Sequence, residues 1–317
     1  MIGIGIVGVA TAFAFAAEPA GQTAAQAPAP AQTIIQQVRA AIAKPDFAAA
    51  DKLLADYKAG KGITPEWLEA YSWMGRGYLA ARKFDEADRY ARETYKMSAA
   101  MLKTRQMDDE PRLPIAYGAA VEVIAHVEAE RGARTDAILF LERELKTHGA
   151  TSIAKRVQKN INLLSLEGTK APAIVSTEYL GPKPPTVDEL KGKVVLMFFW
   201  AHWCPDCKNM APVLARLQEE FGSKGFVVFA PTQRYGYTTR GRDAGPDEEN
   251  RHIDQVRREH YSVLAGQPVP LDEANHLRYG VSTTPTVVLV DRQGIIRLYH
   301  PGQMRYEQIQ PLVSRLM

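Results

Sequence analysis

The stretch FFWAHWCPDCKNMAP, residues 198–212, contains the only two cysteines of this 317-residue chain. Cys204 and Cys207 are separated by two residues and follow an aromatic, apolar run. A zinc site would need further ligands, but no other cysteine exists and the seven histidines show no suitable paired spacing. A structural disulfide here would close a loop too short to constrain the unfolded chain. The pair is therefore predicted to cycle between dithiol and disulfide, without a metal or another cofactor.

The flanking sequence places the two cysteines between a buried strand and a helix. Residues 193–200 are an apolar run without helical periodicity, as in a strand that is buried on both faces. Residues 208–221 carry apolar side chains at three- and four-residue spacing, which is typical of an amphipathic helix. The positive end of a helix dipole stabilises a thiolate and lowers the pKa of a cysteine. We predict Cys204, at the exposed start of the helix, as the attacking thiol and Cys207 as the resolving thiol.

Residues 169–317 resemble the thioredoxin-fold domain of the TlpA-like thiol–disulfide oxidoreductases. The resemblance rests on four ordered motifs: APAI (171–174), LKGKVVLMFFWAHWCPDC (190–207), YGVSTTPTVVLVDRQGII (279–296) and HPG (300–302). It implies an α/β thioredoxin fold and a cis peptide bond between Thr284 and Pro285 that faces the cysteines. In such a position Thr284 is free to pair with a substrate strand. A proline that opens the β-branched run after it is also compatible with an ordinary strand start.

Several residues around the motif are candidates for tuning the thiols or contacting substrates. Thioredoxins carry a buried acid six residues before the first cysteine, but this chain has Phe198 there, so another proton acceptor, or water, must take the proton of the resolving thiol. Trp203 is predicted to cover the site as an apolar lid. Pro205 suits the first helical turn, and Asp206 is either a first-turn residue or a negative charge that tunes the thiolate. His202 either favours the thiolate when protonated or faces solvent.

The rest of this half fits the same fold. Three further features are predicted: a buried strand over 226–230, a hairpin turn at 291–294 and a closing helix over 307–317. A polar insertion at about 234–270 carries a predicted helix over 248–261. The glycine-rich segment YGYTTRGRDAGP within this insertion is expected to form a loop near the active site.

The N-terminal sequence indicates where the protein acts. Residues 1–17, MIGIGIVGVATAFAFAA, are apolar and end in small residues, which is typical of a secretory signal peptide with an A-x-A cleavage site. The stretch is short for a membrane-spanning helix, and an uncleaved short anchor is the alternative. Residues 18–31 are a Pro/Ala-rich linker. An exported, extracytoplasmic protein, such as a periplasmic one, is therefore expected.

Residues 32–168 are predicted to form a separate all-α domain. Thr64 and Pro65 are a helix start signal, and the small and aromatic residues after them have the spacing of a tetratricopeptide-like helix pair. Degenerate copies of its second helix occur at 44–57 and 130–145. This domain is expected either to dock a partner or substrate peptide, or only to space and stabilise the redox domain.

Composition excludes some function classes. A net charge of +3 is too small to indicate nucleic-acid binding. The sequence predicts an exported oxidoreductase that exchanges disulfides with proteins as a reductant and receives electrons from a membrane reductase. One alternative is a thiol peroxidase of the same superfamily, which would need a threonine where Ala201 stands. The other is a non-enzymatic scaffold that only binds partners.

Overall fold

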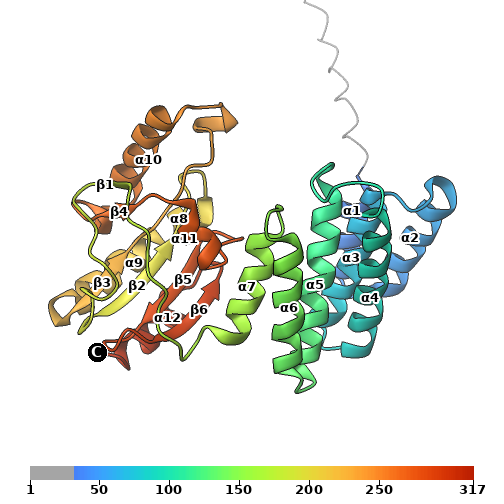
Figure 1. The fold of residues 1–317 in the computed structure, drawn as a ribbon, viewed down its shortest axis with the longest axis horizontal. Coiled ribbons are helices and arrows are strands. Elements are labelled where there is room, and N and C mark those ends of the chain that lie inside the picture. The colour runs from blue at the N-terminus through green and yellow to red at the C-terminus, as the bar shows by residue number, and fades with distance from the viewer. Residues whose placement is uncertain (1–31) are drawn as a thin grey trace, which may run out of the picture. The chain divides into compact units, whose positions relative to one another are not determined.

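A computed structural model describes residues 32–317 of the chain (Figure 1). A helical region comes first, and a region of mixed strands and helices follows it, as predicted. The predictions for residues 1–17 and 18–31 concern segments that lie outside the described residues. Within residues 32–317, no helix combines the length and the apolar character that a membrane span requires.

The N-terminal region is built from helices that pack in sequence order. Each helix contacts the next one along the chain, and α1, α3, α5 and α7 also contact one another in succession. This arrangement confirms the predicted all-α region, whereas the likeness to tetratricopeptide repeats stays a prediction. The helices of this region are α1 (Ile34–Ile42), α2 (Phe47–Lys61), α3 (Pro65–Ala80), α4 (Phe84–Met101), α5 (Arg112–Glu130), α6 (Arg134–His148) and α7 (Ala154–Ser165).

The local signals read from the sequence explain how α3 and α4 meet. Thr64 is the N-cap of α3, where its hydroxyl accepts a hydrogen bond from the Trp67 N–H at 3.1 Å. Pro65 occupies the first turn, where its missing N–H costs little. A Cβ added at Gly75 would lie 3.5 Å from the carbonyl oxygen of Ala87. The two helices therefore cross closely at small residues.

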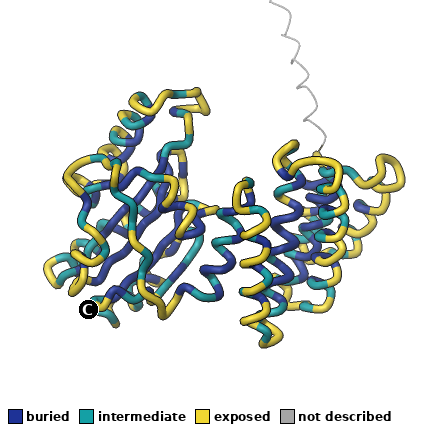
Figure 2. The backbone as a smooth tube through the Cα atoms, in the orientation of Figure 1, coloured by how far each residue is buried: buried dark blue, intermediate teal, exposed yellow. Residues whose placement is uncertain are grey.

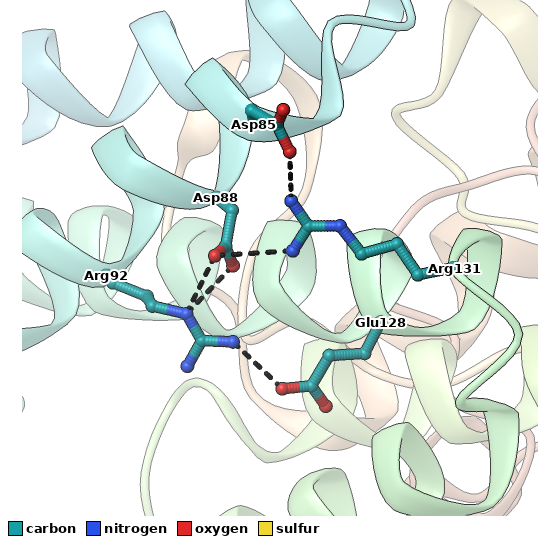
Figure 3. Close-up of polar contacts among 5 residues, drawn as sticks. All are labelled: Asp85, Asp88, Arg92, Glu128 and Arg131. Carbon is teal, nitrogen blue, oxygen red and sulfur yellow. Dashed lines mark hydrogen bonds and ion pairs between the residues drawn. The ribbon is translucent and has the colours of Figure 1, made fainter.

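A network of ion pairs connects α4 to the C-terminal end of α5 (Figure 3). The Arg92 guanidinium lies 2.9 Å from the carboxylate of Asp88 and 3.0 Å from that of Glu128. Arg131 contacts Asp85 at 2.5 Å and the shared Asp88 at 3.5 Å. Isolated surface pairs contribute about 0–1 kcal/mol each, but the shared carboxylate of Asp88 links both arginines in one network.

The C-terminal region contains a four-stranded sheet of order β3-β2-β5-β6. Strand β2 is parallel to β3 and antiparallel to β5, and β5 is antiparallel to β6. A two-stranded pair, β1 and β4, stands beside it. The strands are β1 (Tyr179–Leu180), β2 (Val194–Phe199), β3 (Phe226–Phe229), β4 (Val269–Pro270), β5 (Thr286–Val290) and β6 (Ile296–Pro301). The helices are α8 (Pro205–Asn209), α9 (Ala211–Phe221), α10 (Pro246–His260), α11 (Glu273–Arg278) and α12 (Tyr306–Ser314), with short 3-10 turns at Gly222–Lys224, Thr239–Gly241 and Ser262–Leu264.

The central strands are covered on both faces. Every residue of β2 is buried, as the dark blue strands of Figure 2 show. Its alternate side chains belong to two cores, one with Leu217 of α9 and Ile309 of α12, the other with Leu166 and Tyr279. Full burial of one such apolar side chain contributes about 1.5–3 kcal/mol. The predicted two-sided burial of this strand is therefore confirmed.

One predicted helix is interrupted. Instead of a single helix over 208–221, α8 ends at Asn209 and α9 begins at Ala211. Pro212 has no N–H, so it cannot donate the helical hydrogen bond to the carbonyl of Lys208. The N–H of Met210 donates to the carbonyls of Asp206 and Cys207 at the break. The predicted second strand, hairpin and closing helix are present, and the insertion contains α10 where a helix was predicted.

Helix α7 packs against the C-terminal region as well as against α6. It contacts β6 and α11, and Lys155 pairs with Glu273 at 2.7 Å. The side-chain amide of Asn162 donates to the carbonyl of Arg278 at 3.4 Å. At Gly280 (φ 59°) an added Cβ would lie only 2.4 Å from the backbone nitrogen of Lys159. The loop before β5 thus rests directly on α7, and the boundary placed at residue 168 stays a prediction.

Candidate functional site

The two cysteines form a disulfide at the N-terminus of α8. Their Cα atoms lie 5.3 Å apart. Cys204 is the N-cap residue, and its Sγ accepts a hydrogen bond from the backbone N–H of Cys207 at 3.1 Å. Such N–H groups have no partner within the helix. This donor can therefore hold negative charge on Cys204 once the disulfide is open.

Both cysteines are buried in the disulfide form. Cys204 is 2% exposed and Cys207 is 0% exposed, so the expectation of an exposed Cys204 is wrong for this state. The residue before Cys204 and the two residues between the cysteines supply the adjacent surface. Trp203 is 45% exposed, and Pro205 and Asp206 are also exposed. These three side chains therefore form the face beside the disulfide, and their roles in substrate contact or tuning stay predictions.

The loop before β5 brings a second segment to the disulfide. The peptide bond between Thr284 and Pro285 is cis, as the resemblance implies. The carbonyl oxygen of Thr284 lies 3.4 Å from the Sγ of Cys204. Ser282 and Thr283, which precede it, are exposed. The fold thus places Thr284 and Pro285 beside Cys204, while their binding of a substrate strand stays a prediction.

His202 is buried beneath the insertion and does not face solvent. Its Nε2 lies 3.3 Å from the Oε1 of Glu249, a residue of α10. The rings of Tyr235, Tyr237 and His252 pack edge-on against it, with centroid distances of 5.8, 5.6 and 5.0 Å. Burial, and then repulsion from His252, lower the pKa of His202, while the neighbouring carboxylate of Glu249 acts in the opposite direction. The glycine-rich segment lies next to the site, as expected.

Glu249 is a buried acid beside His202 that was not predicted as a residue of the site. Only 1% exposed, its carboxylate accepts hydrogen bonds from the N–H groups of Tyr235 at 2.5 Å and Gly236 at 2.9 Å. Phe198, at the position of the acid in thioredoxins, lies fully buried in the core. The sequence does indicate that Glu249 is buried, because Glu249 lies one helical turn before Ile253 on the buried face of α10.

Comparison with known proteins agrees with this geometry. Residues 166–312 match the model of the Redoxin family. The Thioredoxin-like protein YneN of Bacillus subtilis (strain 168) is 29% identical over 145 residues, which cover 45% of this chain and 76% of YneN. The Thiol-disulfide oxidoreductase ResA of Bacillus thuringiensis (strain Al Hakam) is 27% identical over 151 residues, or 47% of this chain and 78% of ResA.

A third relative is the Thiol:disulfide interchange protein DsbE of Allochromatium vinosum. It is 31% identical over 143 residues, which cover 41% of this chain and 65% of DsbE. The C-terminal region of this chain is therefore a redoxin domain with the thioredoxin fold. This confirms the resemblance drawn from the ordered motifs and the predicted order of a helical region followed by an α/β thioredoxin fold.

Proposed function

We propose that this protein catalyses thiol–disulfide exchange with protein substrates through Cys204 and Cys207. The observation that carries the proposal is the position of the Cys204 Sγ. It accepts the N–H of Cys207 at the start of α8 and lies 3.4 Å from the carbonyl of Thr284. The names of the relatives ResA and DsbE support the same reaction class.

The exchange requires two thiolate attacks. In the reduced protein, the Cys204 thiolate attacks one sulfur of a substrate disulfide and displaces the other substrate sulfur as a thiolate. The Cys207 thiolate then attacks the Cys204 sulfur of the mixed disulfide and displaces the second substrate thiolate. The substrate leaves with two thiols, and the protein keeps the Cys204–Cys207 disulfide. Thr284 would align the substrate chain at Cys204, and Trp203 would cover the reacting sulfurs.

We propose the reducing direction for this exchange. A strongly stabilised thiolate makes a strong oxidant, but burial lowers the pKa of His202 and so disfavours a positive charge on that imidazole near Cys204. Between the cysteines stand Pro205 and Asp206, and a carboxylate there opposes a nearby thiolate. We expect a reduction potential nearer to about −270 mV, as in thioredoxin, than to about −120 mV, as in a strong oxidant.

An exported location and a membrane reductase as electron donor are part of the same proposal. The apolar stretch over 1–17 supports export. A chain with no cysteine beyond the exchanging pair also avoids mixed pairings in an oxidising compartment. In cells, a membrane-impermeant maleimide should label the reduced pair. Labelling only after lysis would contradict export.

The reaction is tested by insulin reduction with dithiothreitol as electron source. We expect the wild-type protein to accelerate insulin precipitation and Cys204→Ser to be inactive. Equilibration with glutathione buffers then gives the potential of the pair. A value above about −180 mV, where disulfide isomerases lie, would overturn the reducing assignment. Inactivity with insulin together with rapid consumption of hydrogen peroxide would instead indicate a peroxidase, and inactivity in both assays a binding scaffold.

A further inference from the structure

A cavity of about 730 Å³ lies beside the loop that carries Thr284. Its walls come from α3, α5 and α7 of the helical region, from the segments that precede α5 and α7, and from Ser282 and Thr283 of the loop before β5. Charged side chains from all three helices line it, among them Arg76, Glu122 and Arg156. The cavity is therefore a pocket with both charged and apolar walls, shared by the helical region and the redoxin domain.

Arg76 is the unusual residue of this pocket. Its guanidinium stacks over the ring of Trp73, 4.4 Å from the ring centroid. Its Nε and Nη2 atoms are buried and find no hydrogen-bond acceptor among the described residues, and the same holds for the Nε1 of Trp73. Burial lowers the pKa of Arg76 to about 10, so the side chain is still charged at pH 7. A buried charged donor without an acceptor is costly, so the pair is suited to an external acceptor.

The other charges of the pocket already have partners. Arg156 and Lys159 lie 2.9 and 3.0 Å from the same carboxylate oxygen of Glu122. The two cations hold the pKa of Glu122 below its usual value despite its burial. The carboxylate of Asp108 accepts hydrogen bonds from the backbone and the hydroxyl of Ser152. Arg76, by contrast, forms no ion pair within residues 32–317.

The pocket adjoins the residue that contacts the reacting sulfur. Thr283 lines the pocket, and the carbonyl of the next residue, Thr284, lies 3.4 Å from the Sγ of Cys204. Neighbouring Cα atoms are about 3.8 Å apart, and an extended chain advances about 3.3 Å per residue. A substrate strand beside Thr284 would therefore reach the pocket about two to four residues from its own cysteine.

We propose that this pocket binds a carboxylate of the polypeptide whose disulfide is exchanged at Cys204, with Arg76 and Trp73 as the donors. The inference rests on the proposed exchange function and adds to it a substrate class: proteins with an acidic group two to four residues from the exchanged cysteine. A charge-assisted hydrogen bond of this kind corresponds to a gain of roughly 10- to 100-fold in affinity.

Matched peptides test this selectivity. Each probe is a C-terminally amidated decapeptide whose single cysteine forms a mixed disulfide with 2-mercaptoethanol. Glutamate is placed two, three or four residues from the cysteine on either side, and a twin carries glutamine. For at least one placement, the reduced wild-type protein should exchange the glutamate peptide roughly 10- to 100-fold faster than its twin. In Arg76→Gln this ratio should fall toward one.

The control variant is Arg143→Gln, which removes an exposed arginine of α6 outside the pocket. It changes the net charge equally and should keep the wild-type ratio. Neutral 2-hydroxyethyl disulfide should react at the same rate with all three proteins. The free energy of unfolding of Arg76→Gln should fall only by the lost stacking on Trp73, because the removed N–H groups have no acceptor among the described residues.

A binding measurement separates this inference from the exchange function. Cysteine-free versions of the peptides are titrated into the oxidised protein by calorimetry, so that no exchange is needed. A glutamate preference that Arg76→Gln removes supports the pocket even if no disulfide reacts. Equal binding of both twins by the wild-type protein, or a preference that survives in Arg76→Gln, overturns the proposal.

Discussion

Replacing Gly280 by alanine tests how firmly the loop before β5 is held on α7. Gly280 has a φ of 59°, a left-handed conformation that costs an alanine about 1–2 kcal/mol. Its new Cβ would lie 2.4 Å from the nitrogen of Lys159, 2.6 Å from the Cα of Lys159 and 2.7 Å from the carbonyl carbon of Gln158. These are backbone atoms, so no side-chain rotation relieves the overlap. Overpacking of this kind costs about 1–3 kcal/mol more.

We therefore expect Gly280→Ala to lower the free energy of unfolding by about 2–5 kcal/mol in urea titrations of the oxidised protein. Gly266→Ala is the matched control, because Gly266 has a φ of 69° and nothing within 4 Å of an added Cβ. Gly266→Ala should incur only the cost of the left-handed backbone conformation, about 1–2 kcal/mol. Equal losses in the two variants would refute the close packing of this loop on α7.

Three further predictions concern the site and its surroundings. Glu249→Gln should lower the free energy of unfolding by about 1–3 kcal/mol in urea, because its carboxylate accepts two backbone N–H groups while buried. Glu248 is half-buried and pairs with Arg242 at the surface, so Glu248→Gln should cost less than about 1 kcal/mol; equal costs would contradict the role of Glu249 as a buried acceptor. Burial lowers the pKa of His276 to about 3, so the unfolded chain, with a pKa of about 6.5, binds the extra proton. The free energy of unfolding should thus fall by about 1.4 kcal/mol per pH unit from pH 6.5 toward pH 3, and His276→Phe should remove this part of the slope. Finally, Cys207→Ser should accumulate a mixed disulfide through Cys204, visible on non-reducing gels, whereas Cys204→Ser should trap nothing; equal trapping would reverse the two roles.

The parts of the site that adjoin the motif could be predicted from the sequence. The apolar run of β2, the stripe of α9 and the proline at the start of β5 are local patterns, and each has one structural solution in this fold. The order of the motifs then determined which segments meet at Cys204. The break at Met210 was missed although its cause, Pro212, is local, because the apolar spacing continues across it.

The parts that depend on distant packing could not be predicted. His202 was expected to face solvent or carry a proton, but the insertion folds over it and places Glu249 beside it. Nothing in the sequence near His202 encodes that cover. The pocket at Arg76 is formed by α3 and by the loop before β5. These two segments are separated by more than half of the chain, so no local sequence pattern predicts the pocket.

The loop before β5 makes three contacts within a few residues: with helix α7, with the pocket of Arg76 and with the sulfur of Cys204. Gly280 rests on the backbone of α7, Thr283 lines the pocket of Arg76, and Thr284 touches the sulfur of Cys204. A group bound at Arg76 would thus be held at a nearly constant distance from the reacting sulfur. Binding energy gained away from the reacting atoms accelerates exchange when it fixes their geometry. The helical region, through α3 and α7, would then select the substrate as well as stabilise the redoxin domain.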